Sequence, residues 1–360
     1  MTDDEPLPID PDAPAPPHTG GGGTAIVLFG GGARAAYQVG VLRALARRVP
    51  DLRMPILTGV SAGAINAVSM AAHAGCFLDS VEELTDLWSN LEVEDVFRVD
   101  SSSLAGNVTR WLGRLVSGGH VLAPKVRGLV DTEPLRRLLT RALHADGNGE
   151  IPGIARSVET GTLRSLGILT SNYGTGQSVI WTQGKGIEAW ERPNRRSVRT
   201  TITVEHVMAS AALPMFFPAV RIGDGWHGDG GLRLTTPLSP AIHLGADRLL
   251  AISTRYRRTT PEADRSTLTG YPPPVAIAGQ LLNAIFLDNL DQDYLRVERL
   301  NLLLSELPEE KRHGLRVLEV AAIRPSRDLG AMAGELEPRL PRMFRYLVRG
   351  LGSRETSSPD

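Results

Sequence analysis

The sequence predicts an α/β protein in which helices flank a mainly parallel central sheet. Short apolar runs rich in β-branched residues alternate with longer segments of helical periodicity, an order typical of layered α/β domains. Two glycine-rich turns near the start of the chain each follow such an apolar run and precede a helical segment. With 42% hydrophobic residues in 360, the chain is long enough and apolar enough to bury an extensive core.

The predicted elements follow one another in strand–helix order. The first strand covers residues 24–29, and the helix over residues 35–48 ends before Pro50. The second pair is a short strand at 55–58 and an alanine-rich helix at 62–74, whose small side chains permit close packing on a sheet. Further strands are predicted at 164–171, 178–181, 219–222 and 248–253, and further helices at 81–90, 133–144, 204–211, 239–245, 275–304 and 337–347.

Both ends of the chain have the composition of disordered segments. Residues 1–23, rich in Pro, Asp and Gly, predict a disordered arm, and residues 352–360 predict a disordered tail. No linker or repeat divides the chain between them, so residues 24–351 are expected to form one domain. Residues 100–127 fit the strand–helix order poorly, and two interpretations stay open: a mobile cap that touches lipid, or an ordinary packed excursion.

Charge and composition exclude several classes of protein. A net charge of −1 argues against a protein built to bind nucleic acid. Cys76 is the only cysteine, which excludes an intrachain disulfide and suits a reducing compartment. There is no secretory signal, and the apolar stretch at 60–74 is too short and too polar to span a membrane. We therefore expect a soluble, cytoplasmic protein with peripheral membrane contact, no metal and no cofactor.

The second glycine-rich turn has the pattern of a nucleophile elbow. In G-x-S-x-G a serine lies on a sharp bend between a strand and a helix, and the flanking glycines avoid a steric clash. Here the serine is Ser61, between Gly59 and Gly63. The first turn would aim backbone N–H groups at the oxyanion that forms when a serine attacks an ester. Its residues are Gly30, Gly31, Gly32, Ala33 and Arg34. Together the two turns indicate acyl-transfer chemistry.

Ser61 needs a base, and the best candidate is Asp229, which Gly230 and Gly231 follow. An ordinary carboxylate, with a pKa near ~4, is a weak base for a hydroxyl, and partial desolvation would raise that pKa. The apolar run at 213–218, with Trp226, would supply such surroundings. Its large side chains either line an acyl-chain pocket or fill the core: Leu213, Met215, Phe216 and Phe217.

Four motifs in this order resemble those of the patatin-like phospholipases, over roughly residues 26–324. They are Gly30 to Arg34, Gly59 to Gly63, the apolar segment at 209–218, and Asp229-Gly230-Gly231 followed by Pro237 and Leu238. The resemblance implies a patatin-like fold and a Ser–Asp dyad, with Ser61 as nucleophile and Asp229 as base. It also places the N–H groups of Gly31, Gly32 and Ala33 at the oxyanion, with Arg34 on the same loop. The chain departs from the family at Ala35, where a glycine usually follows the basic residue.

The resemblance implies a serine-dependent lipid acyl hydrolase of the phospholipase A or lysophospholipase type that needs no calcium. Its substrate would be a phospholipid or a lysophospholipid. The sequence does not specify the head group, the ester position, the acyl-chain length, the oligomeric state or an activating protein.

Three other interpretations stay open. An α/β-hydrolase would combine Ser61 and Asp229 with a later histidine, His243 or His313, although both have structural-looking surroundings. A nucleotide-binding module is disfavoured because the glycine spacing fits neither G-x-G-x-x-G nor a P-loop. A catalytically silent lipid-binding protein of the same fold is disfavoured because Ser61 and Asp229 are both present. His227, close to the predicted base, either tunes Asp229 or is exposed, and we favour the exposed side chain.

Overall fold

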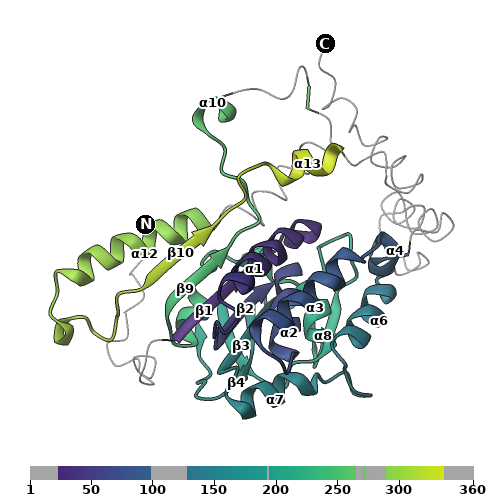
Figure 1. Ribbon diagram of the computed structural model, residues 1–360, viewed down its shortest axis with the longest axis horizontal. Helices are drawn as coiled ribbons and strands as arrows, with labels where there is room; N and C mark the ends of the chain where they lie inside the picture. Colours follow the sequence, from purple (N-terminus) through teal and green to yellow (C-terminus); the bar gives the residue numbers. More distant parts are fainter. Residues whose placement is uncertain are drawn as a thin grey trace, which may run out of the picture.

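The computed structural model describes residues 23–98, 128–192, 194–264, 271–272, 277 and 289–335 (Figure 1). The predicted arm, cap, tail and helix at 337–347 lie outside these residues, as does the first part of the helix predicted at 275–304. The arm was predicted to reach residue 23, but Gly23 already begins the first strand.

The predicted α/β class with a mainly parallel sheet is confirmed. The described strands form one ten-stranded sheet in the order β10-β9-β1-β2-β3-β4-β6-β5, with β8 paired to β3 and β7 to β8. The five strands from β10 to β3 run parallel, while β4 and β8 are antiparallel to β3. The strands are β1 (Gly23–Leu28), β2 (Ile56–Val60), β3 (Ser165–Asn172), β4 (Ser178–Gly184), β5 (Glu191–Arg192), β6 (Arg195–Arg199), β7 (Val220–Ile222), β8 (Gly225–Asp229), β9 (Ala246–Ile252) and β10 (Glu319–Ile323).

Helices cover both faces of the sheet. On one face the strands pack against α1, α2, α3, α6, α7 and α8 in a large apolar cluster, and on the other they pack against α9 and α12. Figure 1 shows α1, α2 and α3 side by side on the first face, and α12 beside β9 and β10. The helices are η1 (Gly32–Ala35), α1 (Ala36–Arg48), α2 (Ala62–Ala72), α3 (Phe77–Ser89), α4 (Val93–Val96), α6 (Glu133–Ala142), α7 (Pro152–Thr160), α8 (Val204–Ser210), η2 (Gly230–Arg233), α9 (Ser239–His243), α10 (Thr260–Ala263), α12 (Asn289–Ser305), η3 (Glu309–Lys311) and α13 (Leu329–Glu335).

The central strands β1, β2 and β3 are buried almost along their whole length because helices cover both faces of the sheet. In β1, Ile26 and Leu28 point to the cluster with α1 and α2, while Ala25 and Val27 point to the cluster with α9 and α12. Since strand side chains alternate between faces, a strand covered on both sides shows no alternation of buried and exposed positions. This is why β1 is a nearly continuous apolar run in the sequence, whereas β3 also buries polar side chains near its carboxyl end.

Several elements escape prediction because pairing in the folded protein, rather than local preference, creates them. β8 reads Gly-Trp-His-Gly-Asp, a poor strand sequence, and it forms because Thr170 to Asn172 of β3 pair with it. The sequence analysis also did not anticipate β5, β6, β10, α4, α7 or α13. None of the described helices combines the length and the apolar character that crossing a bilayer requires.

A glycine lets α2 pack directly on the end of β1. A Cβ on Gly63 would stand 2.5 Å from the carbonyl oxygen of Phe29 and closer still to that of Leu28. Such a separation is well below van der Waals contact, so helix and strand would have to move apart. The close contact brings the end of β2 and the start of α2 beside the loop that follows β1.

We expect the substitutions Gly63→Ala and Gly40→Ala to change the free energy of unfolding in opposite directions. Gly63→Ala should lower it by at least ~2 kcal/mol through overpacking. Gly40 lies in α1 with no atom within 4 Å of an added Cβ, so Gly40→Ala should raise it by ~0.5–1 kcal/mol through helix propensity. Urea unfolding of both variants measures the two changes. A neutral Gly63→Ala would show that α2 does not need this contact.

Candidate active site

Three segments that are distant in the sequence meet at the carboxyl edge of the parallel strands. The first glycine-rich turn, Gly30 to Arg34, is called the glycine loop below, and it follows β1. Ser61 follows β2, and Asp229 ends β8. Asp229 lies opposite Thr170, near the carboxyl end of β3. The carboxyl edge is where open α/β sheets place their ligand sites.

Ser61 occupies a strained bend between β2 and α2. Its φ of 56° and ψ of −132° are unusual for a residue other than glycine. A Cβ on Gly59 would lie 2.7 Å from the Cα of Ala64, so this glycine is required for the sharp return of the chain into the helix. The amide of Ser61 donates to the Oγ of buried Ser210, at 3.0 Å. This geometry is that of a nucleophile elbow, and Ser210 on α8 supports it.

The glycine loop presents free amides next to Ser61. A Cβ on Gly30 would lie 3.0 Å from the Cβ of Ser61, which shows how closely the loop approaches the elbow. Gly32 has a φ of 56°, and η1 begins there. Among the described residues, no acceptor is found for the amides of Gly31, Gly32 and Ala33. Amides left free in this way can donate to an anion.

Asp229 is buried beside Ser61, and the environment makes its carboxylate more basic. The side chain is 1% exposed, and burial raises its pKa from 3.8 to about 7, opposed by hydrogen bonds from the Ser61 hydroxyl and the Gly231 amide. Oδ1 accepts from Gly231 at 2.8 Å, whereas buried Oδ2 has no partner of full hydrogen-bond geometry among the described residues. A Cβ on Gly230 would overlap the backbone of Leu169, which accounts for the glycine there.

His227 is buried, and the expectation of an exposed side chain was wrong. It is 1% exposed because β8 pairs with β3 there and presents its ring to the core. Its Nδ1 lies 3.0 Å from the Oγ1 of Thr170, and its Nε2 lies 3.3 Å from the Nδ2 of Asn172. Burial lowers the pKa of His227 to about 4, so the ring is neutral near pH 7. The sequence analysis expected Trp226 to help enclose Asp229, but Trp226 is 45% exposed and does not do so.

An apolar cavity of about 450 Å³ opens at Ser61. Its wall includes Gly32, Ala33, Ser61 and Ala62 at the polar end, and side chains of α2, α3, α4 and α6 beyond them. Glu92 is the only charged residue among the described lining residues. Such a cavity accepts a hydrocarbon chain next to a nucleophile and a cluster of free amides.

Three of the four predicted acyl-pocket residues line this cavity. They are Leu213, Phe216 and Phe217, and the ring of Phe217 stacks on that of Phe216 with centroids 5.5 Å apart. Met215 does not belong to the lining: its backbone has a φ of 67°, and its side chain is 70% exposed. The left-handed turn at Met215 directs that side chain to solvent, away from its neighbours.

Most of the cavity wall comes from residues that the sequence analysis did not single out. They lie on α2, α3, α4 and α6 and directly before and after α4: Ile65, Leu87, Trp88, Leu91, Val93, Val96, Phe97, Leu135, Leu138 and Leu139. The signal in the sequence is only the apolar periodicity of these helices, which every core-facing helix shares. Ala62, whose amide begins α2 beside Ser61, and Ser210 were also not anticipated.

Neither histidine of the hypothetical triad lies in this site. His243 belongs to α9, and its ring packs on Trp190 with centroids 4.5 Å apart, where burial lowers its pKa to about 4. His313 is exposed in a turn after η3, with a φ of 47°. Neither side chain is among the described residues of the cavity or among the hydrogen-bond partners of Asp229.

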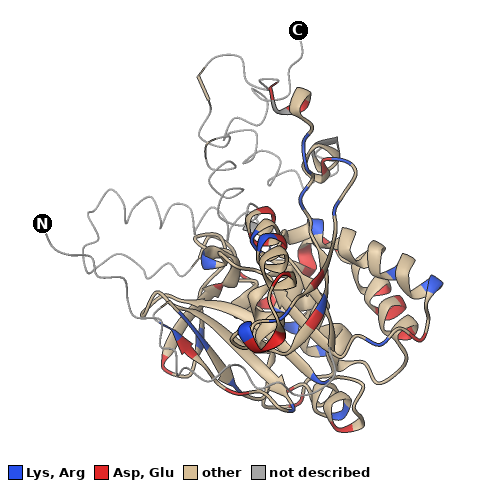
Figure 2. Cartoon of the chain, turned by 90° about the vertical axis from the view of Figure 1, so that its left-hand side faces the viewer, with Lys and Arg blue, Asp and Glu red and all other residues tan. Residues whose placement is uncertain are grey.

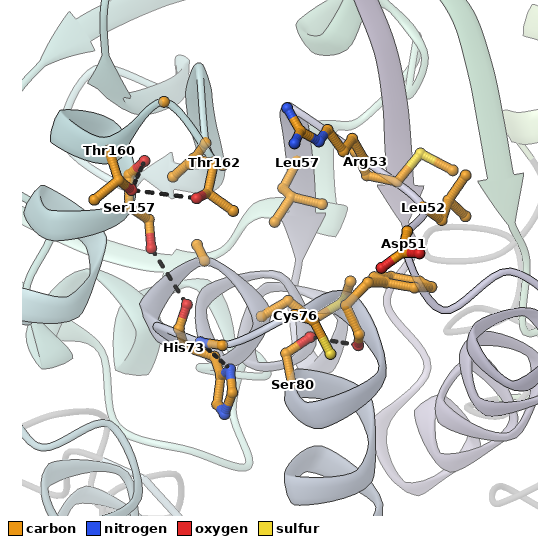
Figure 3. Close-up of a pocket in the computed structure, with 17 residues that line it drawn as sticks. Asp51, Leu52, Arg53, Leu57, His73, Cys76, Ser80, Ser157, Thr160 and Thr162 are labelled. Atoms are coloured by element: carbon orange, nitrogen blue, oxygen red, sulfur yellow. Dashed lines mark hydrogen bonds between the residues drawn. The ribbon is translucent and has the colours of Figure 1, made fainter.

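A second cavity, of about 390 Å³, lies at the other end of α2 (Figure 3). His73, Cys76, Ser157 and Thr160 are among its lining residues, and Ser157 donates to the carbonyl oxygen of His73 at 3.4 Å. Met70, on the last part of α2, lines this cavity, and about 13 Å of helix lies between Met70 and Ser61. Among the described residues, no three His, Cys, Asp or Glu side chains gather as metal ligands.

Charges of both signs are interspersed over the described surface (Figure 2). Arg43 and Arg47, for example, both pair with Glu82 at 3.1 Å. A nucleic-acid-binding face would instead gather Lys and Arg in one continuous patch.

The sequence matches the model of one protein family. A family model described as "Patatin-like phospholipase" matches residues 26–242. Among solved structures, VipD from Legionella pneumophila is 14% identical with a TM-score of 0.35, over 73% of this chain and 55% of VipD. The type III effector protein ExoU is 15% identical with a TM-score of 0.28, over 95% of this chain and 74% of ExoU. The chain thus spans about half the length of VipD. A comparison with the curated proteins gives no match.

We expect Asp229→Asn to stabilise the protein, and more so at high pH. The folded-state pKa of about 7 lies above the ordinary 3.8, so the folded state binds the proton more tightly and loses stability as pH rises from about 4 to about 7. The neutral amide removes this penalty and should raise the free energy of unfolding by ~1 kcal/mol or more at pH 8, and by less at pH 5. Urea unfolding at both pH values measures it, with exposed Asp51→Asn as the control for a lost charge. An equal change at both pH values would contradict the raised pKa.

Proposed function

The chain belongs to the patatin-like phospholipase family, a family of lipid acyl hydrolases, and from this premise we propose that it cleaves acyl esters of phospholipids or lysophospholipids with a Ser61–Asp229 dyad. The observation that carries the proposal is a buried carboxylate of raised pKa beside a strained serine, at the mouth of an apolar cavity. Perturbed titratable groups of this kind, placed at a cavity, are typical of catalytic sites.

Asp229 takes the proton of Ser61 as the serine attacks the ester carbonyl. A base is most effective when its pKa lies near the working pH, and burial moves the pKa of Asp229 to about 7. Oδ1 is engaged by Gly231, which leaves Oδ2 as the oxygen that accepts the proton. Asp229 then returns this proton to the leaving alcohol. In the second half of the reaction it activates a water that releases the fatty acid.

Backbone amides stabilise the negative charge that forms on the carbonyl oxygen. The free amides of Gly31, Gly32 and Ala33 belong to the loop that approaches Ser61, and the amide of Ala62 follows Ser61 at the start of α2. Loss of one such donor typically costs about 3–4 kcal/mol of transition-state stabilisation. Because the amides supply this stabilisation, the scheme needs no calcium.

The cavity would hold the acyl chain, and its almost wholly apolar lining disfavours a polar head group inside it. Each buried methylene contributes ~0.8 kcal/mol to binding, so a lining of Leu, Val, Phe and Trp side chains favours a long hydrocarbon chain. The protein would reach its substrate by peripheral contact with a membrane surface that faces the cytoplasm.

Fatty-acid release from phospholipid vesicles in excess EDTA tests the dyad. We expect release by the unmodified protein and a loss of at least about 10³-fold in Ser61→Ala and in Asp229→Ala, with both variants folded. The double variant His243→Ala/His313→Ala is the matched control and should keep full activity. Loss of activity in that control, with folding intact, would favour a triad. No release by the unmodified protein would favour a catalytically silent lipid binder.

We expect the hydrolysis rate to rise with pH through about 7. Asp229 must be deprotonated to accept the proton of Ser61, so kcat/KM should fall about tenfold for each unit of pH below its pKa. A pH profile with a soluble short-chain ester measures this without the complication of a membrane surface. The variant His227→Gln removes the buried histidine. Its kcat/KM should still rise with pH, because the ring of His227 is already neutral. A profile flat from pH 5 to pH 8 would rule out Asp229 as the base.

A further inference from the structure

The glycine loop is held from behind by buried side chains. The Nε2 of Gln38 donates to the carbonyl oxygen of Phe29 at 2.8 Å, and the Oγ1 of Thr254 donates to the carbonyl oxygen of Gly30 at 2.7 Å. Gln38 is 0% exposed and Thr254 is 2% exposed. Two successive carbonyls at the start of the loop are therefore fixed by side chains from α1 and from the segment that follows β9.

A chain of buried amides fixes the frame of this loop. Gln38 Nε2 also donates to the carbonyl of Ile252 at 3.0 Å, and its Oε1 accepts from Asn66 at 3.0 Å. Asn66 Nδ2 in addition donates to the carbonyl of Ala35 at 3.3 Å, and its Oδ1 accepts from Trp88 at 2.7 Å. Every polar hydrogen of the two amides is used, and fully satisfied buried networks are rigid.

Thr254 sets the direction of the first free amide. In a trans peptide the carbonyl of one residue and the N–H of the next point in opposite directions. Because the Gly30 carbonyl points to Thr254, the N–H of Gly31 points away from it. This peptide has glycine on both sides, so a flip about it meets little steric resistance in the backbone itself. The hydroxyl of Thr254 is the described group that holds the carbonyl, and hence the amide, in this orientation.

We propose that Thr254 is a positioning residue that keeps the Gly31 amide oriented for the oxyanion beside Ser61. The proposal rests on the proposed function, since the orientation of this amide matters for catalysis only if an oxyanion forms there. Thr254 contacts the loop rather than the cavity: an added Cβ on Gly31 would lie 2.5 Å from its Oγ1, and it is not among the described lining residues. It acts through Gly31 and does not contact the reacting atoms.

Kinetics of Thr254→Val and Thr254→Ser test the proposal. Valine keeps the shape of threonine but has no hydroxyl, and serine keeps the hydroxyl. We expect Thr254→Val to lower kcat about 10- to 100-fold with KM within about twofold, and Thr254→Ser to restore kcat to within about threefold. Thr58→Val is the matched control, because the buried Oγ1 of Thr58 has no hydrogen-bond partner and its loss should leave kcat unchanged.

Crystal structures of the same variants supply a readout that does not depend on activity. The Gly30–Gly31 peptide should turn over or become disordered in Thr254→Val and keep its orientation in Thr254→Ser. An unchanged peptide in Thr254→Val, or an unchanged kcat despite a turned peptide, overturns the proposal. If the unmodified protein releases no fatty acid, the proposed function fails separately. The orientation of the peptide in the two variants then still decides whether Thr254 holds it.

Discussion

The site depends on the close approach of α2 to the end of β1. Ser61 keeps a strained backbone because Gly59 and Gly63 let the chain turn from β2 into α2 against neighbouring backbone. A side chain at either glycine would move the helix, and with it Ser61, away from the loop after β1. Backbone contacts therefore set the separation between the nucleophile and the free amides, and packing keeps the strain in place.

The burial that makes Asp229 a base also makes it a source of instability. A carboxylate without a charged partner is costly in the interior, and the raised pKa expresses that cost. The surrounding core supplies the compensation: β3, which pairs with β8, is buried along its whole length. The raised basicity of Asp229 and the local loss of stability thus come from the same desolvation.

In the described part of the chain, the polar groups around the site form two sets, one without hydrogen-bond partners and one with all partners present. The free amides and Asp229 Oδ2 are left unsatisfied and face the reaction. Behind them, Gln38, Asn66 and Trp88 satisfy one another and the backbone. Satisfied groups hold the unsatisfied ones in place, because a peptide whose carbonyl is bound cannot turn its amide freely.

The sequence by itself indicated the α/β class, the first strands and helices in their order, the sharp turn at Ser61 and the glycine loop, and it predicted Asp229 as the base. These features are local: glycine spacing encodes a turn geometry, and an apolar run encodes a buried strand. Only the tertiary structure decided that His227 is buried, that Met215 points to solvent and that α3, α4 and α6 complete the cavity. It alone also brought Thr254 to the carbonyl of Gly30. Burial and distant contacts depend on which surfaces meet, and neighbouring residues in the chain do not specify that.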